Sequence, residues 1–254
     1  MIIEVLGSGT SQGVPVIGCQ CIVCTSIDSR DKRSRSSILI HLDDINIGID
    51  IGPDFKMQIM RSGIQEMHGI FITHEHNDHV IGLDELRPFN FKMGSPIPIW
   101  LEPRVAMEMR KRFAYAFEPS KYPGLPEIEL IEIEAGQQIP IGDTKVEALR
   151  VMHGRLPILG FKIGEFAYLT DAKSFPSETM DKLMECKYVI INALHKQPHH
   201  AHLNLDEALN IAEQLPAEKI WLTHLSHHAG RHRDIEPNLP ERVRLAYDGL
   251  KIFM

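Results

Sequence analysis

The chain has 254 residues, of which 43% are hydrophobic and 24% are charged, and its formal net charge is −7. Such a length suits one large domain with a sizeable core, and the composition is that of a globular protein. The acidic balance gives no broad attraction to nucleic acid, and no segment is apolar for long enough to span a bilayer. We therefore expect neither nucleic acid nor a membrane as a partner. Because no signal peptide is evident, we expect a cytoplasmic location.

The N-terminal half is predicted to consist of short strands and two helices. Runs of β-branched residues predict the strands, and apolar positions at helical spacing predict the helices. We expect strands at 2–6, 37–41, 45–51, 69–73 and 96–101, and helices at 55–62 and 105–113. The second and third strands are separated by Leu42, Asp43 and Asp44, which predicts a hairpin.

The C-terminal half follows the same pattern. We expect strands at 128–133, 145–151, 161–170, 188–192, 219–223 and 250–253, and helices at 178–185 and 205–215. No repeat, low-complexity tract or linker divides the chain. Strands interspersed with helices predict a single α/β domain over residues 1–254, with sheets covered by helices.

Several predicted strands end abruptly in a residue that can bind a metal, often after threonine. Strand ends in one region of a sheet converge on a common edge, from which short loops project ligands on a rigid frame. The residues in question are His74, His153, Asp171 and His224. Four such endings indicate a metal site rather than coincidence.

The densest group of possible ligands is the run His74-Glu75-His76-Asn77-Asp78-His79. Three imidazoles and a carboxylate in one short loop can bind one or two divalent ions. This mixture of ligands suits zinc, manganese or iron. A solvated polar loop is the alternative, but the three other strand ends supply matching ligands.

This run resembles the metallo-β-lactamase superfamily, whose signature His-x-His-x-Asp-His follows a buried strand. The resemblance implies an αββα sandwich of two mixed sheets flanked by helices. It also implies two divalent ions, zinc or manganese, and hydrolysis by a metal-bridging hydroxide. By resemblance one ion is held by His74, His76 and His153, the other by Asp78, His79 and His224, and Asp171 bridges them. Asp78 would thus belong to the catalytic machinery. Asp50 either orients a ligand histidine or is a turn carboxylate.

A second metal site is predicted near residues 19–24, where Cys19, Cys21 and Cys24 supply three thiolates. A closed tetrahedral zinc site needs a fourth ligand, and the segment 223–228 offers better candidates than Cys186. The arrangement resembles the PhnP-type cyclic phosphodiesterases, in which a histidine three positions after the last catalytic histidine completes a structural zinc site. That residue is His227 here, with His228 as the competing choice. A redox or adventitious thiol cluster is the other reading.

The same resemblance assigns a catalytic role to His202, which would contact the scissile phosphate and protonate the leaving oxygen. The neighbouring His199 and His200 are interpreted as solvent-exposed bystanders.

We therefore predict a metal-dependent phosphodiesterase acting on a small cyclic or nucleotide-like phosphodiester. The alternatives are a tRNA 3′-processing endonuclease, a β-lactam or thioester hydrolase, a PQQ-biosynthesis-type protein and a zinc-stabilised binding module. A tRNA enzyme would need a clamping arm, and no comparable insertion is evident. A homodimer is the expected default for a soluble enzyme.

Overall fold

The computed structural model describes residues 1–118 and 124–254, and these fall into two compact units. Unit 1 comprises Met1–Gly7, Arg35–Glu134 and Gly249–Met254. Unit 2 comprises Ser8–Ser34 and Ala135–Asp248. That these units make a single domain stays a prediction. None of the helices in the described residues is both long and apolar enough to traverse a lipid bilayer.

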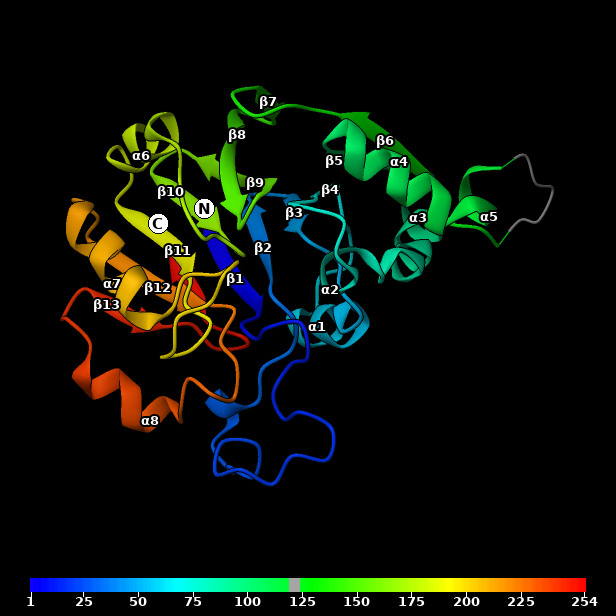
Figure 1. Ribbon diagram of the computed structural model, residues 1–254. Helices are drawn as coiled ribbons and strands as arrows, with labels where there is room; N and C mark the ends of the chain where they lie inside the picture. Colours follow the sequence, from blue (N-terminus) through cyan, green and yellow to red (C-terminus); the bar gives the residue numbers. More distant parts are fainter. Residues whose placement is uncertain (119–123) are drawn as a thin grey trace. The chain divides into compact units, whose positions relative to one another are not determined.

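Unit 1 is built on a mixed sheet of seven strands among the described residues (Figure 1). In spatial order these are β14 (Lys251–Phe253), β1 (Ile2–Gly7), β2 (Ser37–Leu42), β3 (Ile45–Ile49), β4 (Gly69–Phe71), β5 (Ile97–Leu101) and β6 (Ile128–Glu132). The pairs from β14 to β3 are antiparallel, and those from β3 to β6 are parallel. The predicted hairpin of β2 and β3 is confirmed.

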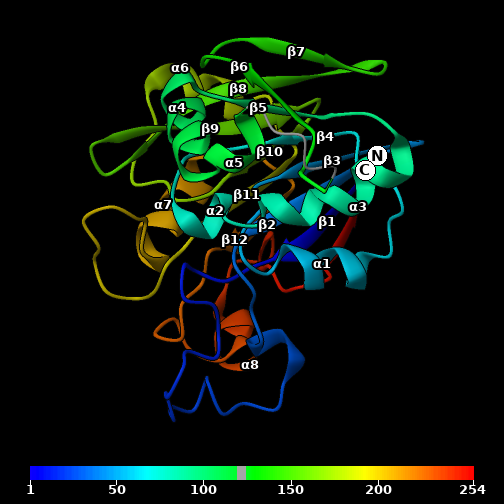
Figure 2. The same cartoon turned by 90° about the vertical axis from the view of Figure 1, so that its right-hand side faces the viewer.

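The helices of unit 1 contribute apolar side chains to the core beside this sheet, and Figure 2 shows the course of these helices. They are α1 (Phe55–Ser62), α2 (Asn77–Val80), α3 (Arg87–Met93), α4 (Pro103–Arg112) and α5 (Ala114–Phe117), with a 3-10 turn at Leu83–Leu86. Phe55 of α1 is fully buried, and Val105 and Met109 of α4 join the same core. The helix α1 ends at Gly63, whose φ of 77° lies in the left-handed region that suits a helix end.

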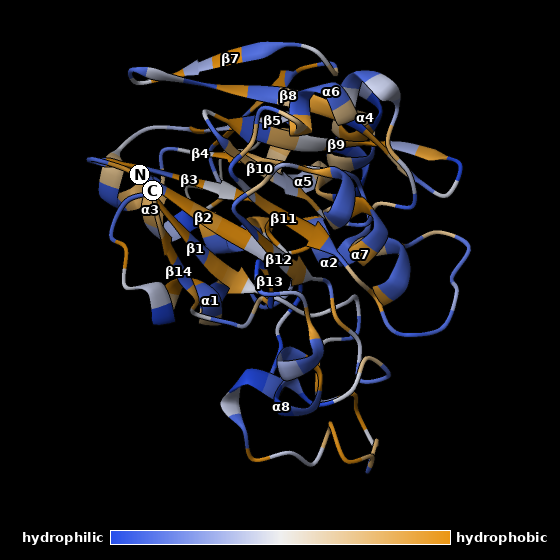
Figure 3. Ribbon diagram, turned by 90° about the vertical axis from the view of Figure 1, so that its left-hand side faces the viewer, coloured by the Kyte–Doolittle hydropathy of each residue, from blue (hydrophilic) through white to orange (hydrophobic). Residues whose placement is uncertain are grey.

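Unit 2 is built on a second mixed sheet of seven strands, again counted within the described residues. In spatial order these are β13 (Val243–Leu245), β12 (Lys219–Thr223), β11 (Tyr188–Asn192), β10 (Phe166–Leu169), β9 (Leu156–Ile163), β8 (Thr144–His153) and β7 (Gln138–Ile141). Hydrophobic residues dominate β11, as Figure 3 shows. The helices are α6 (Ser177–Leu183), α7 (Leu205–Gln214) and α8 (His232–Ile235), with 3-10 turns at Ser29–Asp31 and Glu236–Asn238.

The predicted strand 161–170 is wrong, because it is two strands rather than one. Ile163 pairs with Phe166 across a tight turn, and the antiparallel strands β9 and β10 diverge from it. Gly164 makes the turn possible with a φ of 56°. The nearly continuous apolar run hides this two-residue break. The edge strands β7 and β13 were also not predicted, since they have only four and three residues.

Strand direction decides where the polar residues that follow the strands gather. Strands β8, β10 and β12 run in the same direction. Both β8 and β10 are antiparallel to β9, and the strands β10, β11 and β12 are parallel to one another. His153, Asp171 and His224 therefore lie at one edge of the unit 2 sheet. In unit 1, the parallel pair β3 and β4 brings Asp50 and His74 to one edge in the same way.

Candidate metal-binding sites

In unit 1, the run from His74 to His79 leaves β4 and turns directly into the short helix α2. His74 and His79 are fully buried, Asp78 is partly buried and His76 is exposed. The Nε2 atom of His74 lies 2.9 Å from Nδ1 of His76, and Nε2 of His79 lies 3.2 Å from a carboxylate oxygen of Asp78. Such separations suit ligands of a shared ion, since two donors at about 2.0–2.2 Å from a metal lie roughly 3 Å apart.

The buried carboxylate of Asp50 orients two of these imidazoles. It accepts a hydrogen bond of 2.7 Å from Nδ1 of His79, which leaves the Nε2 lone pair of that ring available to a metal. It also accepts from the backbone N–H of Thr73 at 2.9 Å and from the Thr73 hydroxyl. That hydroxyl in turn accepts from Nδ1 of His74 at 2.9 Å, which fixes the second ring. Of the two interpretations of Asp50, these contacts favour the orienting role.

The environment of Asp50 sets two opposing influences on its pKa. Burial raises the pKa of the carboxyl, while the imidazole of His79 and the donors of Thr73 favour the ionised form. A carboxylate buried in this way is retained only where donors satisfy its oxygens.

Three residues of the candidate sites adopt the left-handed backbone conformation, which is uncommon outside glycine. Asp50, Asp171 and His224 have φ values of 65°, 57° and 56°. Each directly follows or lies just beyond a strand, so the chain turns sharply there and the side chain leaves the sheet edge. Such a conformation costs about 1–3 kcal/mol per residue and concentrates at functional sites. Residue type gives a weak signal for it, since aspartate and histidine tolerate this region better than most.

A close backbone approach holds the segment 74–79, called the metal loop below, against the turn that carries Asp50. The backbone N–H of Ile51 donates to the carbonyl of His79 at 2.8 Å. A Cβ atom added at Gly52 would lie 2.1 Å from the carbonyl oxygen of Asp78. Glycine at this position therefore permits the approach.

Two arginines of α4 brace the metal loop from its other side. Arg104 makes an ion pair with the Glu75 carboxylate. Arg112 donates to the Glu75 carbonyl and, at 2.8 Å, to the side chain of Asn77. The sequence did not predict these contacts, because 29 to 37 residues separate the partners.

In unit 2, the predicted residues His153, Asp171, His202 and His224 lie together. Nε2 of His224 lies 3.2 Å from Oδ1 of Asp171, and one donor atom each of His153, Asp171 and His202 lies within 4.8 Å of the others. Nδ1 of His153 donates to the carbonyl of Ala201 at 2.9 Å, so Nε2 can bind a metal. The donor set fits a divalent ion, because it combines imidazoles with a carboxylate.

The imidazole of His202 is mostly buried beside these ligands. Its ring stacks on that of His224 with centroids 4.9 Å apart, and its Nδ1 lies 3.7 Å from Asp171. Burial, and next the nearby His224, lower the pKa of His202 to about 2. The ring is therefore neutral at pH 7 unless a further negative charge is placed beside it.

The two histidines expected to be exposed bystanders differ from each other. His200 is exposed, as predicted, whereas His199 is half-buried. Nδ1 of His199 accepts hydrogen bonds from the backbone N–H groups of Ala201 and His202, each at 3.2 Å. The prediction for His199 was wrong, because sequence does not show that the loop folds back on this ring.

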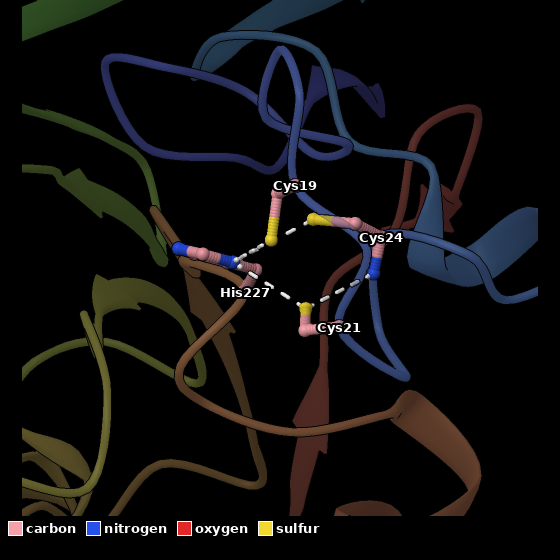
Figure 4. A group of neighbouring side chains, drawn as sticks. All are labelled: Cys19, Cys21, Cys24 and His227. Atoms are coloured by element: carbon pink, nitrogen blue, oxygen red, sulfur yellow. Dashed lines mark hydrogen bonds between the residues drawn. The ribbon is translucent and has the colours of Figure 1, made fainter.

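Also in unit 2, the side chains of Cys19, Cys21, Cys24 and His227 point toward one another (Figure 4). Nδ1 of His227 lies 3.3, 3.5 and 3.5 Å from the three sulfur atoms. A tetrahedral zinc ion with Zn–S of about 2.3 Å and Zn–N of about 2.0 Å would separate nitrogen and sulfur by about 3.5 Å. The donors therefore fit a closed zinc site. The ring of His227, rather than that of the competing His228, lies beside the three sulfur atoms.

The three thiols do not ionise alike. The backbone N–H of Cys24 donates to Sγ of Cys21 and, with smaller contributions from His227, lowers the pKa of Cys21 to about 6. Burial raises the pKa of Cys24 to about 11. Cys186, the alternative fourth ligand, is buried after α6, and burial raises its pKa to about 11. Its surroundings are those of an inert core thiol.

Comparisons with known proteins agree with this fold. The family model "Beta-lactamase superfamily domain" matches residues 45–225. An octanoyltransferase of Porphyromonas gingivalis is 42% identical over 248 residues, which cover 97% of this chain and 50% of that protein. The chain spans about half the length of the curated relatives it matches.

Two solved structures extend the comparison. The crystal structure of a diphosphatase from the PhnP family has a TM-score of 0.92 at 36% identity, covering 99% of this chain and 96% of that chain. Zinc-bound PqqB from Methylobacterium extorquens has a TM-score of 0.77 at 16% identity, covering all of both chains. At that identity, PqqB shows the fold alone.

The two mixed sheets and their helices define the metallo-β-lactamase fold, and the clustered imidazoles and carboxylates could hold metal ions. The chain belongs to the β-lactamase superfamily and resembles its PhnP family most fully among these comparisons. The predicted fold class is therefore confirmed, and the similarity to a PhnP-family diphosphatase supports the predicted enzyme class.

We predict that Asp50→Asn weakens metal binding, because the amide places N–H donors against the donors of Thr73 and His79. Affinity should fall about 10- to 100-fold, the usual range for changes behind a metal ligand. Competition with a chromophoric chelator measures this. The exposed Asp44→Asn is the control, and equal affinities for the two variants would contradict the orienting role.

We predict that Cys21→Ala removes one zinc equivalent per chain and lowers the melting temperature, because three donors bind a structural ion less tightly than four. Elemental analysis and thermal unfolding measure the two effects. Cys186→Ala should keep the full zinc content. Unchanged zinc in Cys21→Ala would exclude the four-ligand site.

Proposed function

We propose that this chain is a phosphodiesterase that hydrolyses a small cyclic or nucleotide-like phosphodiester. The observation that carries the proposal is the position of His202, a histidine buried beside the possible ligands Asp171 and His224. A histidine in such a position can contact the substrate and supply a proton to the leaving oxygen. The 36% identity to a PhnP-family diphosphatase over nearly the whole chain supports a phosphorus-centred substrate.

The ligand sets found separately in the two units support the proposal of two catalytic ions. His74, His76 and His153 would hold one ion, and Asp78, His79 and His224 the other, with Asp171 shared between them. Zinc or manganese suits this mixture of imidazole and carboxylate. When bound, the pair would lower the pKa of water toward 7 and stabilise charge on the phosphate oxygens.

The chain's own residues would do the remaining work. Asp50 holds the imidazoles of His74 and His79 with their Nε2 atoms available to metal, so few rearrangements precede binding. His202 is neutral in its buried surroundings, and an anionic phosphate beside it would favour the protonated ring. The substrate itself would thus prepare His202 to protonate the leaving oxygen.

The site of Cys19, Cys21, Cys24 and His227 is proposed to hold one structural zinc ion. Four protein ligands leave no open position for a substrate or water, so this ion would not take part in hydrolysis. It would connect the segment Ser8–Ser34 to the loop that follows β12, both of which belong to unit 2.

The other activities have weaker support. Similarity to PqqB is limited to the fold. The formal net charge of −7 gives no broad electrostatic attraction to tRNA. The octanoyltransferase name belongs to a protein of which this chain covers half. A homodimer and a cytoplasmic location remain expectations.

We predict that Asp78→Ala and Asp171→Ala each reduce the turnover of bis(p-nitrophenyl) phosphate by more than about 100-fold, because each removes a direct ligand. A ribose cyclic phosphate, a diphosphate-linked dinucleotide, a pre-tRNA and an octanoyl thioester serve as parallel substrates, with zinc or manganese added. Turnover that survives both substitutions would contradict the two-ion site. Faster hydrolysis of the thioester than of every phosphate compound would contradict the proposed function.

We predict that His202→Ala slows substrates in proportion to how much their leaving group needs a proton. Turnover of an alkyl phosphodiester should fall by about 10²–10⁴-fold, the usual range for general acid catalysis. Turnover of bis(p-nitrophenyl) phosphate should fall much less, because p-nitrophenolate leaves without protonation. Equal losses for both substrates would show that His202 is not the proton donor.

A further inference from the structure

The segment between β11 and α7 carries His202 and supports His153, and its two ends are firmly attached. Leu203 donates its N–H to Ala172 at 2.7 Å and accepts from Leu194 at 2.9 Å. At the start of α7, Asn204 caps the helix through reciprocal bonds with Glu207. These bonds fix the chain from residue 203 onward.

The residues just before this anchor are held by a side chain instead. The backbone N–H groups of Ala201 and His202 both point at Nδ1 of His199, at 3.2 Å each. One ring nitrogen thus satisfies two consecutive peptide groups. Both would otherwise need other acceptors.

These bonds have consequences for two residues of the proposed centre. The carbonyl of Ala201 accepts from Nδ1 of His153 at 2.9 Å, which fixes the tautomer that leaves Nε2 available to a metal. The next residue is His202, whose ring lies 4.5 Å from that of His153 by centroids. A shift of this short stretch would move both imidazoles together.

We propose that His199 is a positioning residue, whose Nδ1 atom holds the Ala201–His202 backbone and so sets the orientation of both His153 and His202. Its geometry requires a lone pair on Nδ1, which the neutral ring with a proton on Nε2 provides. Burial, followed by His200 and His195, lowers the pKa of His199 and favours that neutral form. The effect on turnover depends on the proposed function, whereas the effect on the backbone does not.

Substitution of His199 by asparagine or by glutamine distinguishes an acceptor at the Nδ1 position from a polar side chain that merely fills the space. The Oδ1 atom of asparagine is as many bonds from Cα as Nδ1 of histidine, so it can accept the same two N–H groups. The longer glutamine places its oxygen one bond farther out, near the position of Nε2. His200→Ala is the matched control, because His200 is adjacent and exposed.

The first measurement is amide hydrogen exchange of the metal-loaded full chain, read by NMR at Ala201 and His202. Exchange should be at least about tenfold faster in His199→Ala and His199→Gln than in the wild type. In His199→Asn and His200→Ala it should stay within about twofold of the wild-type rate. Side-chain ¹⁵N spectra report the tautomer of His153. They should change in His199→Ala and His199→Gln, in which exchange is faster, and should stay as in the wild type in His199→Asn and His200→Ala.

The second measurement is hydrolysis of bis(p-nitrophenyl) phosphate. Here kcat should fall about 10-fold or more in His199→Ala with a smaller change in KM, and His199→Asn should restore it. Unchanged exchange in His199→Ala, or an asparagine variant as impaired as alanine, would overturn the proposal. If the wild type lacks phosphodiester turnover, the exchange rates still decide the positioning role, and only the proposed function fails.

Discussion

The hydrogen bonds of the buried Asp50 carboxylate are the interaction on which the candidate metal site of unit 1 depends. The carboxylate reaches His79 directly and His74 through the hydroxyl of Thr73, so one group sets the rotation of two imidazoles. A carboxylate removed from water is costly unless donors surround it. Here the donors include the imidazole of His79 and the hydroxyl that holds His74. The same hydrogen bonds therefore satisfy the buried carboxylate and orient the two possible metal ligands.

Unit 2 reaches a comparable result through strand direction. Parallel strands deliver Asp171 and His224 to one sheet edge, and the left-handed backbone at both residues turns their side chains out of the sheet. The strain is local and follows two strands that are buried except for Lys219 at the start of β12. A hydrolase that binds ions through strand ends thereby gains a frame that side-chain packing alone would not supply.

Much of this arrangement could be predicted from the sequence. Apolar runs indicate the positions of most strands, and the polar residues at their ends indicate His74, His153, Asp171 and His224 as possible ligands. What could not be predicted depends on folding at a distance. The bracing of Glu75 by Arg104 and Arg112 joins residues far apart in the chain. The turn at Gly164 was hidden within an apolar run, and the inward position of His199 depends on a loop whose course has no periodicity.

The spacing of His224 and His227 links two kinds of chemistry in unit 2. The first contacts Asp171 and the second contacts the three thiols, and only Leu225 and Ser226 lie between them. A change of geometry at the sulfur atoms can therefore move the backbone of His224, a proposed catalytic ligand. Oxidation of these thiols would release a zinc ion from the proposed site and would disturb the backbone that carries His224, so the turnover of the proposed enzyme would depend on the oxidation state of three cysteines that lie outside its catalytic centre.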